Sequence, residues 1–81
     1  MNYEDVQNKV KNIINKKCLN QNLDENTNLF KDLDMDSLDY AEIVIELEYI
    51  FQTDVLEKQI SWQNIKTIGQ LSMLFFENLN T

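Results

Sequence analysis

The strongest constraint on the fold of this chain is a segment, residues 38–51, in which apolar side chains recur at helical spacing. At about 100° per residue, a stripe of core type spans roughly 120° and holds Tyr40, Ile43, Val44, Leu47, Ile50 and Phe51. A second, narrower stripe, edged by Glu42 and Glu48, collects Leu38, Ala41, Ile45 and Tyr49. One buried face explains only the first stripe. The second indicates either a helix buried on two sides or an apolar strip, rimmed by carboxylates, that is offered to a partner.

Two further segments have the periodicity of core helices. The first follows Asn2 as a cap, ends near Cys18 or Leu19, and carries the apolar residues Val6, Val10, Ile13 and Ile14. The last opens with a capping-box pattern, Thr67 at the cap and Gln70 three residues on, and its core face holds Ile68, Leu71, Leu74, Phe75 and Leu79. Gly69 lies in the first turn of this helix, where we expect it to reduce stability.

The remaining segments are predicted as a long loop and a short helix. Residues 20–36 have no helical period, and the loop is expected to be held on the core by Leu23, Leu29, Phe30 and Leu33. Residues 55–65 predict a short, irregular helix. With 81 residues, no proline and one glycine, the chain is predicted to form one all-α domain over residues 1–81. The expected architecture is a small antiparallel bundle of three main helices plus one short helix, and we expect a monomer.

The charge is strongly acidic and unevenly distributed. Nine acidic residues and no basic one lie between Asp32 and Glu57, whereas four lysines lie in the first predicted helix. Nucleic acid is an improbable partner, because phosphates require cations and the chain has no arginine. An acidic surface would instead attract a basic protein surface, although acidity could also serve only solubility.

Compartment and redox state follow from what the chain does not contain. No apolar run is as long as a membrane span, and the N-terminus lacks the order of a signal peptide. The single cysteine, Cys18, cannot form an internal disulfide and is expected to pack as a small apolar residue at the end of the first helix. A cytoplasmic location is therefore expected.

Ser37 has the most distinctive setting of any polar residue in the chain. The chain has no histidine, and none of the usual histidine or lysine general bases is a neighbour of Ser37 in sequence, so a self-activating nucleophile is not expected. The start of a helix is, however, a favourable place for a phosphate, because unpaired N–H groups and the helix dipole both attract an anion. The alternative is that Asp36 or Ser37 simply caps the helix.

The D-x-D-x-D spacing of Asp32, Asp34 and Asp36 matches the first half of an EF-hand loop and raises the question of a metal site. The later positions do not match. Ser37 stands where glycine is required, Asp39 where an apolar residue is usual, and Ile43 where the bidentate glutamate belongs. We therefore predict no calcium loop, and only weak, nonspecific cation binding stays open.

The same segment resembles the acyl carrier protein family. Asp32-Leu33 followed by Asp36-Ser37-Leu38-Asp39 is similar to the family signature D-L-x-x-D-S-L-D. Glu42, Val44, Leu47, Glu48 and Phe51 match its helix pattern E-x-V-x-x-L-E-x-x-F. The segment 67–71 resembles the T-V-x-D-L opening of the last helix, and Val10, Ile13 and Ile14 fit the usual first helix. The resemblance thus covers nearly the whole chain, in order.

This resemblance implies a carrier and not a catalyst. A separate phosphopantetheinyl transferase would attach 4′-phosphopantetheine from coenzyme A to Ser37, and the thiol of that group would carry acyl chains as thioesters between enzymes. The helix after Ser37 would dock acyl-transfer, condensing and modifying enzymes through their basic patches. The expected partner contacts are Asp36, Leu38, Asp39, Glu42, Ile45 and Glu48. The core between the helices would receive part of the acyl chain.

Departures from the family pattern bear on the pathway. Many housekeeping members have glycine where Asp34 stands, and acids where Tyr49 and Ile50 stand. These changes favour a carrier dedicated to a polyketide, modified-lipid or other special pathway over a housekeeping fatty-acid carrier, which stays close behind. Two other classes remain open: an acidic scaffold module without a prosthetic group, and a cation-binding helical domain built on Asp32, Asp34 and Asp36.

Overall fold

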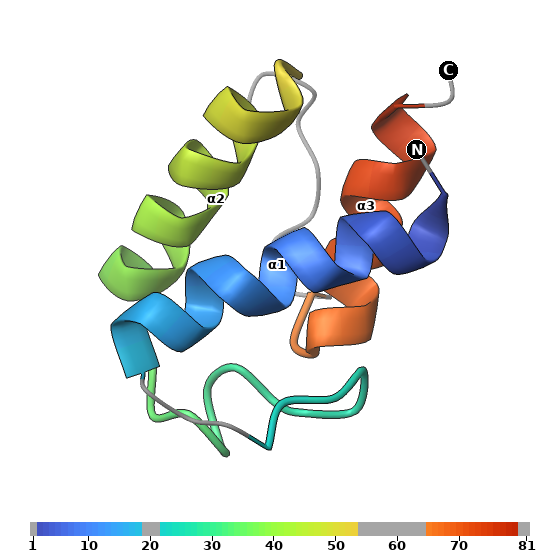
Figure 1. Ribbon diagram of the computed structural model, residues 1–81. Helices are drawn as coiled ribbons and strands as arrows, with labels where there is room; N and C mark the ends of the chain where they lie inside the picture. The colour runs from blue at the N-terminus through green and yellow to red at the C-terminus, as the bar shows by residue number, and fades with distance from the viewer. Residues whose placement is uncertain (1, 19–21, 54–64, 80–81) are drawn as a thin grey trace.

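The computed structural model describes residues 2–18, 22–53 and 65–79, which form three helices (Figure 1). They are α1 (Tyr3–Cys18), α2 (Ser37–Phe51) and α3 (Ile68–Leu79). α1 runs across the other two helices and contacts both. The predicted all-α bundle of three main helices is confirmed, with the refinement that α2 and α3 run in the same direction, from bottom to top in Figure 1. The short helix predicted at 55–65 falls outside the described residues, apart from Ile65.

The N-terminal ends of α1 and α3 are capped by nearby side chains, as predicted. The Asp5 amide donates a hydrogen bond of 2.8 Å to Oδ1 of Asn2, which is therefore the cap of α1. At the start of α3, the Gln70 amide donates to Oγ1 of Thr67, and the Thr67 amide donates to Oε1 of Gln70, both at 3.1 Å. This reciprocal pair is the capping box that the sequence predicts.

The core lies where the three helices meet. The ring centroids of Phe51 on α2 and Phe75 on α3 are 5.4 Å apart, and Tyr3 on α1 meets Phe76 on α3 edge to face at 5.8 Å. The buried apolar residues are Val6, Val10, Ile13, Ile14, Leu29, Met35, Tyr40, Ile43, Val44, Leu47, Phe51, Ile68, Leu71 and Phe75. The predicted core faces of the three helices are largely confirmed.

Three predictions about this core need correction or extension. Ile50, at one edge of the predicted core stripe, is 38% exposed, whereas Val44 at the opposite edge is fully buried, so the buried face of α2 is shifted toward Val44. Ser72 was not predicted to be buried, yet it is, because its hydroxyl donates to the Ile68 carbonyl at 2.7 Å within α3 and so loses no hydrogen bond. Leu74 and Leu79 pack against the core but are only partly buried.

The second stripe of α2 faces solvent. Leu38 is 66% exposed, Ile45 56% and Tyr49 84%. The interpretation of α2 as a helix buried on two sides is therefore wrong, since only the stripe centred on Val44 and Leu47 reaches the core. What remains is an exposed apolar strip with carboxylates beside it.

The loop before α2 is tied to the start of α3 through the backbone. An antiparallel bridge pairs Asn28 with Thr67, and the Leu29 amide donates to the Lys66 carbonyl at 2.7 Å. As predicted, Leu29 is fully buried, and Leu23, Phe30 and Leu33 pack against the core. The loop therefore has a fixed place beneath α1 (Figure 1).

Gly69 is required by this connection. Its amide donates to the Glu25 carbonyl at 2.8 Å, which satisfies one of the first N–H groups of α3. A Cβ at this position would lie 2.9 Å from the Glu25 carbonyl oxygen and 3.2 Å from the Glu25 Cβ. The sequence predicts only the cost of a glycine in the first turn, and the structure adds the reason for it: the lack of a side chain lets the loop approach.

Candidate functional site

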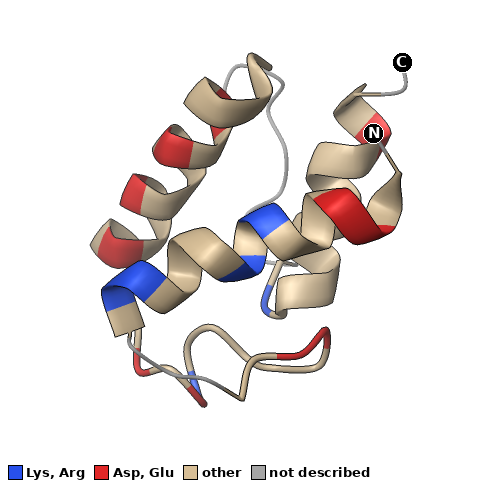
Figure 2. Cartoon of the chain, in the orientation of Figure 1, with Lys and Arg blue, Asp and Glu red and all other residues tan. Residues whose placement is uncertain are grey.

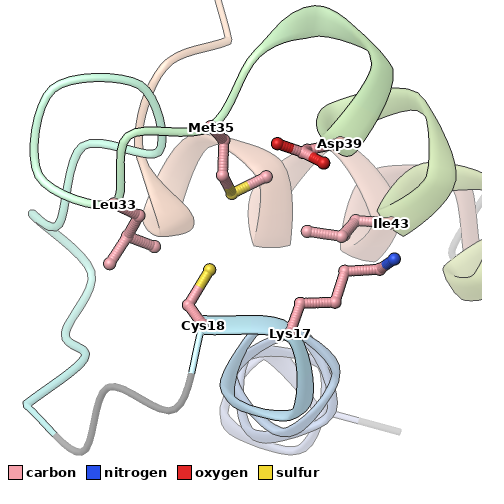
Figure 3. Close-up of a pocket in the computed structure, with 6 residues that line it drawn as sticks. All are labelled: Lys17, Cys18, Leu33, Met35, Asp39 and Ile43. Atoms are coloured by element: carbon pink, nitrogen blue, oxygen red, sulfur yellow. The ribbon is translucent and has the colours of Figure 1, made fainter.

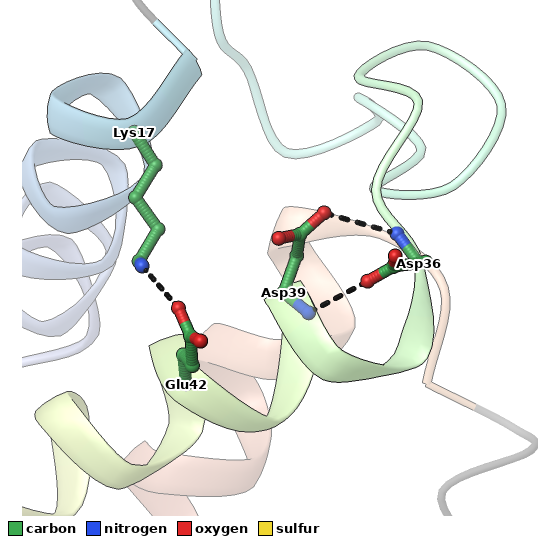
Figure 4. A network of polar contacts seen from close by, with 4 residues as sticks. All are labelled: Lys17, Asp36, Asp39 and Glu42. Carbon is green, nitrogen blue, oxygen red and sulfur yellow. Dashed lines mark hydrogen bonds and ion pairs between the residues drawn. The ribbon is translucent and has the colours of Figure 1, made fainter.

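Two aspartates fix the start of α2 (Figure 4). Asp36 is the cap in extended conformation, and its Oδ1 accepts the Asp39 amide at 2.8 Å. Oδ2 of Asp39 in turn accepts the Asp36 amide at 3.3 Å. This is a capping box with aspartate in place of the more common glutamate. The open question of which residue caps α2 is thereby answered in favour of Asp36.

Ser37 is consequently the first residue of α2 and not its cap. It is exposed, at the end of the helix where the dipole is positive. Since Asp36 and Asp39 already serve the cap, the serine hydroxyl can be modified without taking a hydrogen bond from the helix start.

Met35 and Asp34 determine how the loop reaches the start of α2: Met35 holds it on the core, and Asp34 changes the direction of the backbone. Met35 is buried, and its amide donates to the Leu29 carbonyl at 3.2 Å. Asp34 has φ of 58°, in the left-handed region where glycine has no steric cost and aspartate is tolerated. The resemblance implies glycine at this position in many members of the family, and the left-handed backbone seen here is the conformation that glycine adopts most easily. Sequence reasoning missed Met35, although one apolar residue between two acidic ones in a loop is typical of an anchor.

A cavity of about 260 Å³ opens beside the same end of α2 (Figure 3). It is lined by two residues from each of three segments: Lys17 and Cys18 from α1, Leu33 and Met35 from the loop, and Asp39 and Ile43 from α2. Cys18 is half-buried in this lining, which confirms its predicted packing at the end of the first helix.

Acidic residues recur along α2, and the end of α1 that carries Lys16 and Lys17 lies beside its first turns (Figure 2). Nζ of Lys17 is 2.8 Å from Oε2 of Glu42. This hydrogen bond is the main reason why the pKa of Lys17 is raised, with the nearby charges of Glu42, Glu46 and Asp39 adding to it. Burial raises the pKa of the Tyr40 phenol on the opposite, core-facing side of the helix.

The predicted partner contacts have three different settings. Leu38, Glu42 and Ile45 are exposed, and they form the centre of the predicted surface. Asp36 and Asp39 also hold the cap, and Glu48 is half-buried while its carbonyl accepts the Gln52 amide at the end of α2. The most exposed large apolar residue in the described part of the chain is Tyr49, which belongs to the same stripe but was not among the predicted contacts.

The three aspartates of the D-x-D-x-D spacing have separate local roles. Oδ2 of Asp32 accepts the Asn28 amide at 2.8 Å, Asp36 caps α2, and Asp34 takes the left-handed turn. Within residues 2–18, 22–53 and 65–79, no group of three or more acidic, histidine or cysteine side chains could hold a metal ion. The helices described here include none of the length and apolarity needed to cross a bilayer.

Comparison with known proteins defines the class first. Residues 6–74 match the family described as the phosphopantetheine attachment site. Proteins of this class carry 4′-phosphopantetheine, and so does this one.

Two curated relatives narrow the assignment. The acyl carrier protein of Lactobacillus acidophilus is 35% identical over 71 residues, which cover 85% of this chain and 86% of that protein. The acyl carrier protein of Amoebophilus asiaticus is 43% identical over 44 residues, 54% of this chain and 52% of that protein. The chain belongs to the acyl carrier protein family, and it functions as a carrier that interacts with biosynthetic enzymes.

Proposed function

We propose that Ser37 is the residue to which 4′-phosphopantetheine is attached. The observation that supports this most strongly is the exposure of Ser37 at the first position of α2, where Asp36 and Asp39 have taken over the capping. The ester would join Oγ of Ser37 to the phosphate, at the end of the helix where a negative charge is favoured. When bound, the group supplies a terminal thiol that carries an acyl chain as a thioester.

The chain itself is proposed to perform no catalytic step. The chain has no histidine, so Ser37 lacks the usual base and would be the substrate of a separate phosphopantetheinyl transferase. Fatty-acid, polyketide and related lipid pathways all remain within this proposal. The single domain, the monomeric state and the cytoplasmic location stay predictions.

We further propose that the exposed side of α2 docks the partner enzymes. This docking face consists of Asp36, Leu38, Asp39, Glu42, Ile45 and Glu48. Leu38 and Ile45 supply apolar area at its centre, and the carboxylates supply a rim that matches basic patches on the enzymes. The net charge of −7 adds long-range attraction to such partners.

The attachment is tested by intact mass after incubation with coenzyme A and a promiscuous phosphopantetheinyl transferase. The native chain should gain the mass of one phosphopantetheine, and Ser37→Ala should gain nothing. Ser72→Ala is the matched control, because it removes a serine hydroxyl from α3 without touching α2. Loading of Ser37→Ala, or no loading of the folded native chain, would contradict the proposal and favour a scaffold module.

The docking face is tested by charge reversal. Glu42→Lys and Glu48→Lys should each slow loading by the transferase, because each places a cation opposite a basic patch. Glu77→Lys makes the same change of net charge on the exposed side of α3 and should have a smaller effect. Equal effects at the three positions would show that only net charge matters, and that α2 is not the docking surface.

A further inference from the structure

One ion pair links two described helices at the docking face. Nζ of Lys17, in the last turn of α1, is 2.8 Å from Oε2 of Glu42 on α2 (Figure 4). It is the only ion pair among the residues that the structure describes. Both side chains are partly exposed, so the pair lies on the surface that a partner would cover.

Two further carboxylates of α2 act on Lys17: Asp39 of the docking face, and Glu46, which is not part of it. The hydrogen bond to Glu42 raises the pKa of Lys17 most, and the charges of Glu42, Glu46 and Asp39 raise it further. A partner enzyme with a basic patch would bring a lysine or arginine to the same carboxylates. One oxygen of Glu42 is already occupied by a cation of the chain itself.

We propose that Lys17 is an internal competitor for the basic side chains of partner enzymes and thereby sets the affinity of the docking face. The idea rests on the proposed docking function of α2. To bind, a partner has to displace Lys17 from Glu42 and put its own cation in that place. Enzymes with several closely spaced basic residues overcome this competition, while weakly basic proteins are excluded.

The alternative is that the pair only braces α1 against α2. Exposed pairs of this kind contribute little to folding, so a brace would be weak, and its removal would leave binding unchanged. Once net charge is controlled, the two roles predict different results for Lys17→Gln: tighter binding if Lys17 competes, and unchanged binding if it is only a brace.

Lys16 provides that control. It lies in the same last turn of α1, is exposed, and forms no ion pair with another described residue. Lys17→Gln and Lys16→Gln therefore change the net charge equally, and only the first releases Glu42. The apo forms of both variants would be titrated with a phosphopantetheinyl transferase by calorimetry, with circular dichroism melts to establish folding.

Lys17→Gln should lower the Kd by about two- to fivefold relative to Lys16→Gln, the upper part of the range that an exposed ion pair gives. In a Glu42→Gln background this difference should disappear, because nothing remains to be released. Equal Kd values for the two variants, or weaker binding by Lys17→Gln, would overturn the proposal. So would a gain that persists without Glu42.

The proposed attachment at Ser37 is tested by the loading assay, which is independent of the Kd comparison between the lysine variants. Absence of loading at Ser37 would refute the attachment, whatever the Kd values are. Normal loading, a raised Kd for Glu42→Gln, and equal Kd values for the two lysine variants would leave the docking face intact and refute only the competition by Lys17.

Discussion

Replacing Gly69 by alanine tests whether local helix propensity or the close contact with Glu25 has the larger effect on the unfolding free energy. Propensity alone predicts that Gly69→Ala raises the unfolding free energy by at most about 1 kcal/mol. The added Cβ would, however, lie 2.9 Å from the Glu25 carbonyl oxygen, a backbone atom that accepts the Gly69 amide and cannot turn away without losing that bond. Overpacking of this kind costs about 1–3 kcal/mol. We therefore expect a net loss of about 1 kcal/mol, and at most about 2 kcal/mol.

Urea denaturation followed by circular dichroism measures this change, and a thermal melt should show a Tm lower by about 4–8 °C per kcal/mol for a domain of this size. A pair of variants at an open site of the same helix, Glu77→Ala and Glu77→Gly, gives the control. There alanine should be the more stable of the two, since no neighbouring backbone opposes it. A Gly69→Ala variant that is more stable than the native chain would refute the argument that the loop needs this glycine.

Three further changes test the helix start and the core. Asp34→Gly should raise the unfolding free energy by about 0.5–1 kcal/mol, because it relieves a left-handed residue; a lower Tm would contradict this. Asp36→Ala should lower the unfolding free energy by about 1 kcal/mol, because it removes the cap of α2. Asp36→Asn keeps a capping side chain, so its unfolding free energy should fall less, and urea titrations measure both changes. Above pH 10, the ordinary pKa of tyrosine, the unfolded chain ionises Tyr40 while the buried phenol stays neutral, so stability should fall with rising pH by up to about 1.4 kcal/mol per unit. Tyr40→Phe should remove this part of the pH dependence and the exposed Tyr49→Phe should not; equal curves for both would contradict the assignment.

The helices and their caps could be predicted because their causes are local. The Asn2 cap, the Thr67–Gln70 capping box and the stripe around Val44 each follow from spacing within one or two turns. The sequence predicts that α2 has a second apolar stripe, but it does not predict whether this stripe is buried or exposed. Periodicity within one helix does not show which other segments pack against it. Only the arrangement of α1 and α3 leaves Tyr49 in solvent.

The long-range contacts could not be predicted for the same reason. The approach of Glu25 to Gly69 and the pair between Lys17 and Glu42 join residues that are far apart in the sequence. The capping role of Asp36 was one of two alternatives, since aspartate and serine are both good caps and only the backbone conformation separates them. Ser37, by contrast, was singled out correctly as the exposed polar residue of the helix start, and its attachment chemistry stays a prediction.

At the start of α2, the capping hydrogen bonds come from Asp36 and Asp39, and the residue proposed for modification is Ser37. This separation affects when the chain can be modified. Because Asp36 and Asp39 hold the first turn through each other's amides, the capping hydrogen bonds do not use the Ser37 hydroxyl and would be the same in the free and in the esterified chain. Under the proposed attachment, a newly made chain can therefore form this helix start before it meets a transferase. Loading would then add a reactive group to a helix start that is already formed, and the chain without this group would be a substrate for the transferase as soon as it has folded.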